Sequence, residues 1–86
     1  MKNTNTNLNL VAEDFLKKNP FMSGNMKKAA AELITIYKIP SYRISEQLCG
    51  FLVGNAAGMN ECFYNKLYLA LSAVSNKYNV NVSITA

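Results

Sequence analysis

An uncharged stretch in the middle of this chain is punctuated by glycines at every fourth position. It runs from Gln47 to Asn60, and Gly50, Gly54 and Gly58 recur within it. On an α-helix this spacing would place the three glycines along one stripe, where another backbone can approach closely. The stretch therefore predicts a packing surface, within the fold or against a partner, and it favours a structural or binding role over chemistry.

Two arrangements of this stretch are compatible with the sequence. The glycines either separate two helices by a loop at residues 54–59, or they kink one continuous helix. A glycine in a helix interior costs roughly 1 kcal/mol, so the loop is favoured. The helix before the loop would bury one side, formed by Ile44, Leu48, Phe51 and Leu52.

Helical periodicity on both sides of this stretch predicts three further helices. A short one is expected around Val11–Leu16, and it ends before Pro20. A second is expected to bury Met26, Ala29, Ala30, Leu33 and Tyr37. The clearest follows Asn60 as its cap, with the core stripe Phe63, Leu67, Ala70, Leu71, Val74 and Tyr78.

Both ends of the chain alternate between apolar and polar residues, which is typical of half-buried strands. The two segments are Thr4–Leu10 and residues 80–85, and residues 1–7 are expected to be flexible in isolation. We therefore predict a mainly α single domain over residues 1–86, a compact bundle of four short helices with a small β-element. The N- and C-terminal segments would form that element, by pairing within one chain or between two copies.

The composition argues against catalysis and cofactor binding. Histidine is absent, which removes the usual proton shuttle and most zinc sites. The five acidic residues are scattered along the chain, without the spacing of a catalytic pair or a metal site. The glycines match neither a phosphate-binding loop nor a dinucleotide fingerprint. We therefore predict a non-enzymatic protein without a cofactor or a metal.

Two tyrosines one helical turn apart widen the apolar arc of the last helix. Tyr64 and Tyr68 lie off its core stripe, and such aromatic residues are enriched in protein interfaces. The alternative is a helix that is buried on two sides within its own fold. The candidate interface residues are Gly50, Phe51, Gly54, Gly58, Tyr64 and Tyr68.

The segment Leu33–Leu48 resembles a helix-turn-helix unit, in which a second helix enters the major groove of DNA. The turn Ile39-Pro40-Ser41 carries this resemblance. It implies a transcriptional regulator whose candidate DNA contacts are Lys38, Ser41, Tyr42, Arg43 and Gln47. Bases and phosphates are usually bound by arginine, of which the chain has one, so DNA binding is the alternative prediction.

We therefore expect a small regulatory or inhibitory protein that acts by binding another protein. A homo-oligomer, most simply a homodimer, is expected because the core of an 86-residue chain leaves little stability to spare. Small accessory proteins of phage or bacterial origin share this profile, and they act on lysis timing, host takeover, defence or transcription. The longest uncharged run has 14 residues, too few for a membrane span of about 20. The N-terminus also lacks the apolar core of a signal peptide, so the expected location is cytoplasmic.

Overall fold

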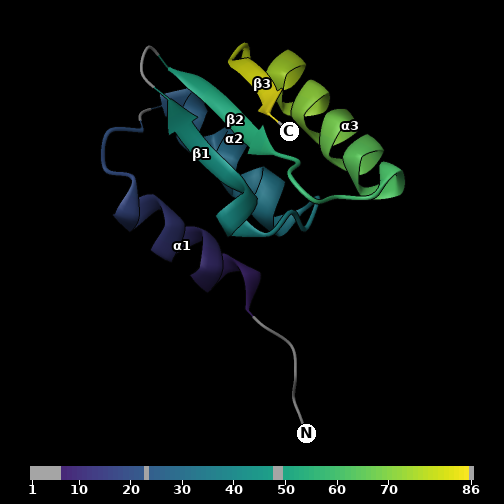
Figure 1. Ribbon diagram of the computed structural model, residues 1–86. Helices are drawn as coiled ribbons and strands as arrows, with labels where there is room; N and C mark the ends of the chain where they lie inside the picture. The colour runs from purple at the N-terminus through teal and green to yellow at the C-terminus, as the bar shows by residue number, and fades with distance from the viewer. Residues whose placement is uncertain (1–6, 23, 48–49, 86) are drawn as a thin grey trace, which may run out of the picture.

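The computed structural model describes residues 7–22, 24–47 and 50–85, and it shows an α+β fold (Figure 1). In chain order the elements are α1 (Leu8–Lys18), α2 (Gly24–Thr35), the 3-10 turn η1 (Ser41–Arg43), β1 (Ile44–Gln47), β2 (Phe51–Asn55), α3 (Glu61–Tyr78) and β3 (Asn81–Thr85). The predicted four-helix bundle is wrong, because a mixed three-stranded sheet takes the place of the third helix.

The sheet has the order β1-β2-β3. The hairpin strands β1 and β2 run antiparallel, with Ile44 opposite Gly54. Strand β3 returns after α3 and pairs with β2 in parallel, from Phe51 opposite Asn81 to Asn55 opposite Thr85. Strand β2 is therefore central, and β3 ends the sheet on the side of α3.

The core lies between one face of the sheet and the helices. Strand alternation directs Ile44, Leu52, Val82 and Ile84 to this inner face. The largest fully buried side chains are Leu33, Ile34, Ile39, Leu52, Leu67, Leu71 and Val74. The outer face of the sheet instead carries exposed polar side chains, namely Ser45, Gln47, Asn55, Asn81, Ser83 and Thr85.

The structure confirms the helices and the strand with the strongest periodicity. Helix α2 buries Met26, Ala29, Ala30 and Leu33, four of the residues in its predicted stripe. Helix α3 follows Asn60, whose side-chain oxygen accepts a hydrogen bond of 2.8 Å from the Phe63 backbone N–H. The predicted strand at residues 80–85 is present as β3.

The predicted third helix is wrong. The described residues of this segment form η1 and the two paired strands β1 and β2, so the glycines do not share a helical stripe. Gly50 has a φ of +79° in the turn of the hairpin, and Gly58 has a φ of +74° in the loop before α3. Glycine adopts this left-handed conformation without steric cost, which is why these positions make turns. Leu48, which was expected on the buried side of that helix, lies outside the described residues.

The predicted N-terminal strand is also wrong where the structure describes it. Helix α1 already begins at Leu8, and the Asn7 side chain caps it by accepting a 3.0 Å hydrogen bond from the Asn9 backbone N–H. Capping by asparagine favours a helix start, and it outweighs the short polar–apolar alternation. Strand β3 pairs with β2 rather than with the N-terminal segment, and residues 1–6 lie outside the described residues.

Candidate protein-interaction site

A groove of about 270 Å³ lies between α3 and β3, which is one of the two end strands of the sheet. Its helical wall contains Tyr64 and Tyr68, which are 41% and 55% exposed. The residues that line the groove are Tyr64, Tyr68, Leu71, Ser72, Val82, Ser83 and Ile84. None of them is charged, so their side chains offer only apolar surface and hydroxyl groups.

Gly54 is the point at which the central strand packs most closely against side chains of α3. A Cβ atom on Gly54 would lie 2.9 Å from Leu71 Cδ1 and 3.1 Å from Leu67 Cδ1, so its absence lets α3 pack closely against the central strand. The inner face of β2 is fully covered, as Leu52 shows with no exposed surface. On β3, by contrast, Val82 and Ile84 are only half-buried. The inner face of the central strand is therefore closed, whereas the inner face of β3 is covered only in part.

The backbone of β3 presents hydrogen-bonding groups at its outer edge. The Thr85 carbonyl accepts a 2.7 Å hydrogen bond from the Ala56 backbone N–H, so it points toward β2. Backbone groups alternate in direction along a strand, and Val82 and Ile84 therefore direct their N–H and C=O groups away from β2. Such a row of unpaired groups can template pairing with another strand.

Ser75 marks the start of this free edge. Its hydroxyl donates a 2.7 Å hydrogen bond to the Val80 carbonyl, and its own carbonyl accepts a 3.3 Å bond from the Val80 N–H. Both backbone groups of Val80 are thus bound by α3. The available edge is the segment from Asn81 to Thr85, and its outward-facing groups belong to two residues.

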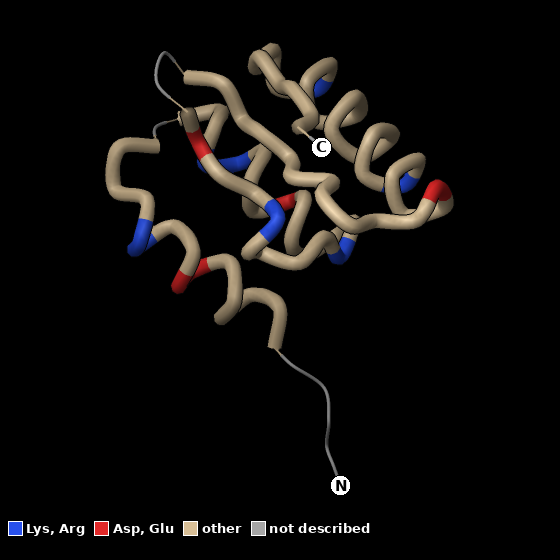
Figure 2. Tube along the Cα trace, viewed as in Figure 1, with Lys and Arg blue, Asp and Glu red and all other residues tan. Residues whose placement is uncertain are grey.

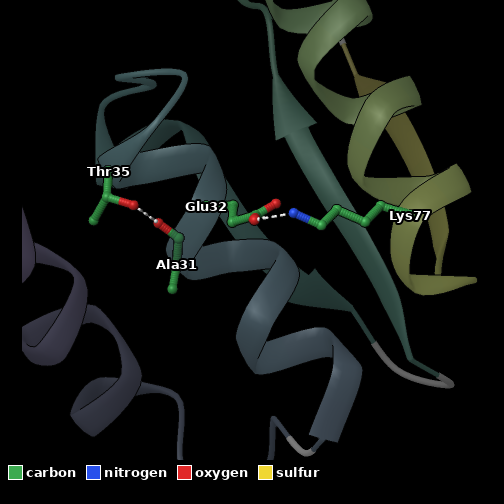
Figure 3. A network of polar contacts seen from close by, with 4 residues as sticks. All are labelled: Ala31, Glu32, Thr35 and Lys77. Atoms are coloured by element: carbon green, nitrogen blue, oxygen red, sulfur yellow. Dashed lines mark hydrogen bonds and ion pairs between the residues drawn. The ribbon is translucent and has the colours of Figure 1, made fainter.

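The charged residues lie on other elements (Figure 2). Neither β2 nor β3 contains a charged residue, although the chain has a net charge of +4. On α3, Lys77 Nζ lies 2.6 Å from Glu32 Oε1, an ion pair that joins this helix to α2 (Figure 3). The hydrogen bond from Lys77 lowers the pKa of Glu32, and the same contact raises the pKa of Lys77. Neither partner of this ion pair lines the groove.

Two of the predicted interface residues line the groove, and the others do not. Tyr64 and Tyr68 are in the wall of α3. Gly54 lies beneath the groove as a packing residue, and Phe51 is 40% exposed on the outer face of the sheet beside Asn81. Gly50 and Gly58 occupy turns. The sequence thus identified the aromatic wall but not the strand edge opposite it.

The residues proposed to bind DNA do not form a recognition helix. Ser41, Tyr42 and Arg43 make up η1, Gln47 ends β1, and Lys38 has a φ of +58° in the connection after α2. The predicted helix-turn-helix geometry is therefore wrong for the described residues 33–47. Arg43 Nη1 donates hydrogen bonds of 3.3 and 2.6 Å to the backbone carbonyls of Asn55 and Ala57, so it holds the loop before α3.

Two other hollows lack the combination of strand backbone groups and tyrosine rings that is found at the groove. One, of about 410 Å³, lies between the α1–α2 connection and the hairpin, and Lys18, Glu46, Gln47 and turn residues line it. The other, of about 320 Å³, lies between Glu13, Leu16, Lys17 and Lys27. Both have charged side chains in their lining, and neither borders β3. The groove is the stronger candidate because fixed backbone groups and aromatic rings meet there.

Within residues 7–22, 24–47 and 50–85, no three His, Cys, Asp or Glu side chains cluster as metal ligands would. In the same part of the chain, no helix has the length and apolar character needed to cross a membrane. Neither a family model, nor a curated protein, nor a solved structure matches this chain. The groove and the edge of β3 are therefore interpreted from their own geometry.

The edge residues Val82, Ser83 and Ile84 were missed as site residues, although the strand itself was predicted. Natural edge strands commonly carry lysine, proline or a bulge that prevents pairing. The segment from Asn81 to Thr85 contains neither a charge nor a proline. The absence of these residues from the segment indicates an edge that is open to pairing, but only when the strand is known to end the sheet.

Proposed function

We propose that this chain is a non-enzymatic protein-binding module that regulates or inhibits its partner. It takes up an extended segment of a partner chain as an additional strand along β3. The observation that carries this proposal is the outward direction of the Val82 and Ile84 backbone groups, beside an uncharged groove with Tyr64 and Tyr68 in its wall.

The arrangement supports recognition in two parts. Main-chain hydrogen bonds to Val82 and Ile84 would supply affinity for any extended segment. Alternate side chains of that segment would enter the groove against Tyr64 and Tyr68, and they would supply specificity. The preferred ligand is therefore an extended peptide with β-branched or aromatic residues at every second position and no charge at those positions.

A selection from a displayed library of random peptides tests this proposal. The immobilised chain is used at low density, and the affinity of the selected peptides is then measured by fluorescence anisotropy. We expect the peptides to show apolar residues at alternate positions and to bind with micromolar affinity, since a short edge and one groove bury little surface.

The discriminating variant is Ile84→Pro, which removes an N–H from the free edge without removing a hydrogen bond to β2. Its matched control is Ile84→Val, which keeps the N–H and shortens the side chain by one methylene. We expect Ile84→Pro to abolish peptide binding and Ile84→Val to keep most of it. Equal binding by both folded variants, or the absence of any selected peptide, would contradict the proposal.

A further inference from the structure

We propose that a second copy of this chain occupies the free edge of β3, as an antiparallel strand related by a twofold axis through Ser83. This inference rests on the proposed function, because it requires that the edge accepts a strand. The product is a homodimer with a continuous six-stranded sheet, in which the two α3 helices lie next to each other on the inner face.

The backbone of β3 is suited to pairing with itself. An antiparallel twofold centred on Ser83 places Val82 of one copy opposite Ile84 of the other. These two residues direct their N–H and C=O groups to the free edge, so each such pair exchanges two hydrogen bonds. The symmetry-related pair, Ile84 of the first copy and Val82 of the second, exchanges two further hydrogen bonds. The outward-facing N–H and C=O groups of both edges then all have hydrogen-bond partners.

The side chains are also complementary in this register. On the inner face Val82 lies opposite Ile84, which joins two β-branched residues beside the tyrosines of the groove. On the outer face Asn81 lies opposite Thr85, and Ser83 lies opposite its own copy, so amide and hydroxyl groups meet. The twofold therefore pairs apolar residues with apolar ones and polar residues with polar ones.

The charge distribution favours a second copy at this surface in particular. Each chain has a net charge of +4, so most faces of two copies repel each other. The β3 edge and the groove contain no charged residue, so two copies can meet there without opposing like charges. Lys66 lies between the two tyrosines in the sequence of α3 but does not line the groove. The antiparallel arrangement places the two Glu61 side chains, at the start of each α3, at opposite ends of the interface.

Sedimentation equilibrium of the full chain tests this inference, over about 1 µM to about 0.2 mM, where weak homodimers dissociate. The wild-type chain is expected to shift from monomer to dimer in this range. Ser83→Lys places two lysines opposite each other, and it is expected to raise the dissociation constant about tenfold or more. The matched control is Ser45→Lys, the same change at an exposed serine of β1 that faces the same β2 residue, Val53, in register.

A mixture of two charge variants tests the partner and the register together. Ser83→Glu alone is expected to dimerise as poorly as Ser83→Lys, whereas an equimolar mixture of the two is expected to recover a dimer at least as tight as the wild type. Only a second copy that pairs at Ser83 produces this recovery. Thermal unfolding by circular dichroism establishes that each variant is folded.

Three results would overturn the inference: a monomeric wild-type chain at every concentration, equal weakening by Ser45→Lys, or a mixture no tighter than its components. A monomeric chain that still binds the selected peptides through its edge would overturn self-pairing alone. A dimer with the expected charge-swap recovery, but no peptide binding by the dissociated chain, would overturn the uptake of other proteins and leave self-pairing intact.

Discussion

At the scale of single residues, Gly54 determines how closely α3 approaches the sheet. Its missing Cβ would lie within 3.1 Å of both Leu67 and Leu71, two fully buried side chains. We predict that Gly54→Ala lowers the free energy of unfolding by about 1–2 kcal/mol, because the core has to shift to accommodate one more carbon. Urea denaturation followed by circular dichroism measures this loss.

A double-mutant cycle with Leu71 identifies the cause of that loss. Leu71→Ala alone is expected to cost about 2–5 kcal/mol, since it removes a fully buried side chain. In the double variant the new methyl group of residue 54 occupies part of the space vacated at residue 71. The two losses should therefore fall short of additivity by at least about 0.5 kcal/mol. Strict additivity would show that close packing at Leu71 is not the origin of the effect.

The ion pair between Glu32 and Lys77 gives a residue-scale prediction for pH. The hydrogen bond from Lys77 holds the pKa of Glu32 below its ordinary value of 4.5, so the folded state binds a proton less readily than the unfolded chain. The stabilisation is therefore present above pH 4.5 and is lost as the pH falls through the folded-state pKa. The pKa of Lys77 is raised above its ordinary value of 10.5 in the folded state. The stabilisation by the ion pair is therefore also lost at high pH, as the pH rises through the folded-state pKa of Lys77.

We accordingly predict that Glu32→Gln destabilises the protein at pH 7 and has almost no effect near pH 2. The loss should be smaller than that of Gly54→Ala, because the Lys77 side chain is 59% exposed and solvent screens the pair. Urea denaturation at several pH values checks this, with Glu46→Gln as the control for a change of charge. A difference between wild type and Glu32→Gln that persisted at pH 2 would contradict the ionic origin.

At the scale of elements, the Asn60 cap fixes where α3 begins, and α3 forms one wall of the groove. The Asn60 side chain accepts a hydrogen bond from the Phe63 N–H, a donor that would otherwise lack a partner within the helix. We predict that Asn60→Ala lowers the free energy of unfolding by about 1 kcal/mol. Asn65→Ala, an exposed position inside the same helix, should instead be neutral or slightly stabilising, because alanine has the higher helix propensity. Equal losses in both variants by urea denaturation would contradict a capping role.

The elements that the sequence predicted are those whose cause is local. Asn60, the following stripe and the alternation in residues 80–85 each act over a few neighbouring residues, and α3 and β3 were predicted accordingly. The hairpin was missed because its strands depend on β3, whose residues pair with residues 30 positions earlier in the chain, as Asn81 does with Phe51. Ile44, Phe51 and Leu52 fit a helical stripe as well as a strand, and only long-range pairing decides between the two. Gly50, between two short apolar segments, is the local feature that indicates a turn.

The part of the candidate site that depends on local sequence was predictable, and the part that depends on long-range pairing was not. Tyr64 and Tyr68 were identified because they depart from the periodicity of their own helix. The opposite wall could not be identified, since a strand becomes an edge only through the order of the whole sheet. A strand in the middle of a sheet with the sequence of residues 81–85 would offer no free backbone groups. The candidate binding surface thus depends on the topology of the sheet, whereas the types of side chain that line it follow from the sequence.

At the scale of the whole molecule, the net charge opposes association of two copies, whereas the proposed interface is uncharged. The salt dependence of dimerisation distinguishes these two contributions. Copies of a chain with a net charge of +4 repel each other, while the proposed interface at β3 contains no charge. Raising NaCl from about 50 to about 500 mM shortens the screening length from roughly 14 to roughly 4 Å. We predict that the homodimer becomes slightly tighter over this range, because the general repulsion is screened and no ion pair is lost.

DNA binding through the lysines that give the chain its positive charge would respond to salt in the opposite direction. The release of counterions makes the affinity for DNA fall steeply as the salt concentration rises. Sedimentation equilibrium at both salt concentrations measures the dimer, and fluorescence anisotropy with a random labelled duplex measures association with DNA. We expect weak, non-specific DNA binding at 50 mM NaCl that disappears at 500 mM, where the dimer persists. A dimer that weakened strongly with salt would show that charged groups hold the copies together, and it would place their contact on the lysine-bearing helices rather than at β3.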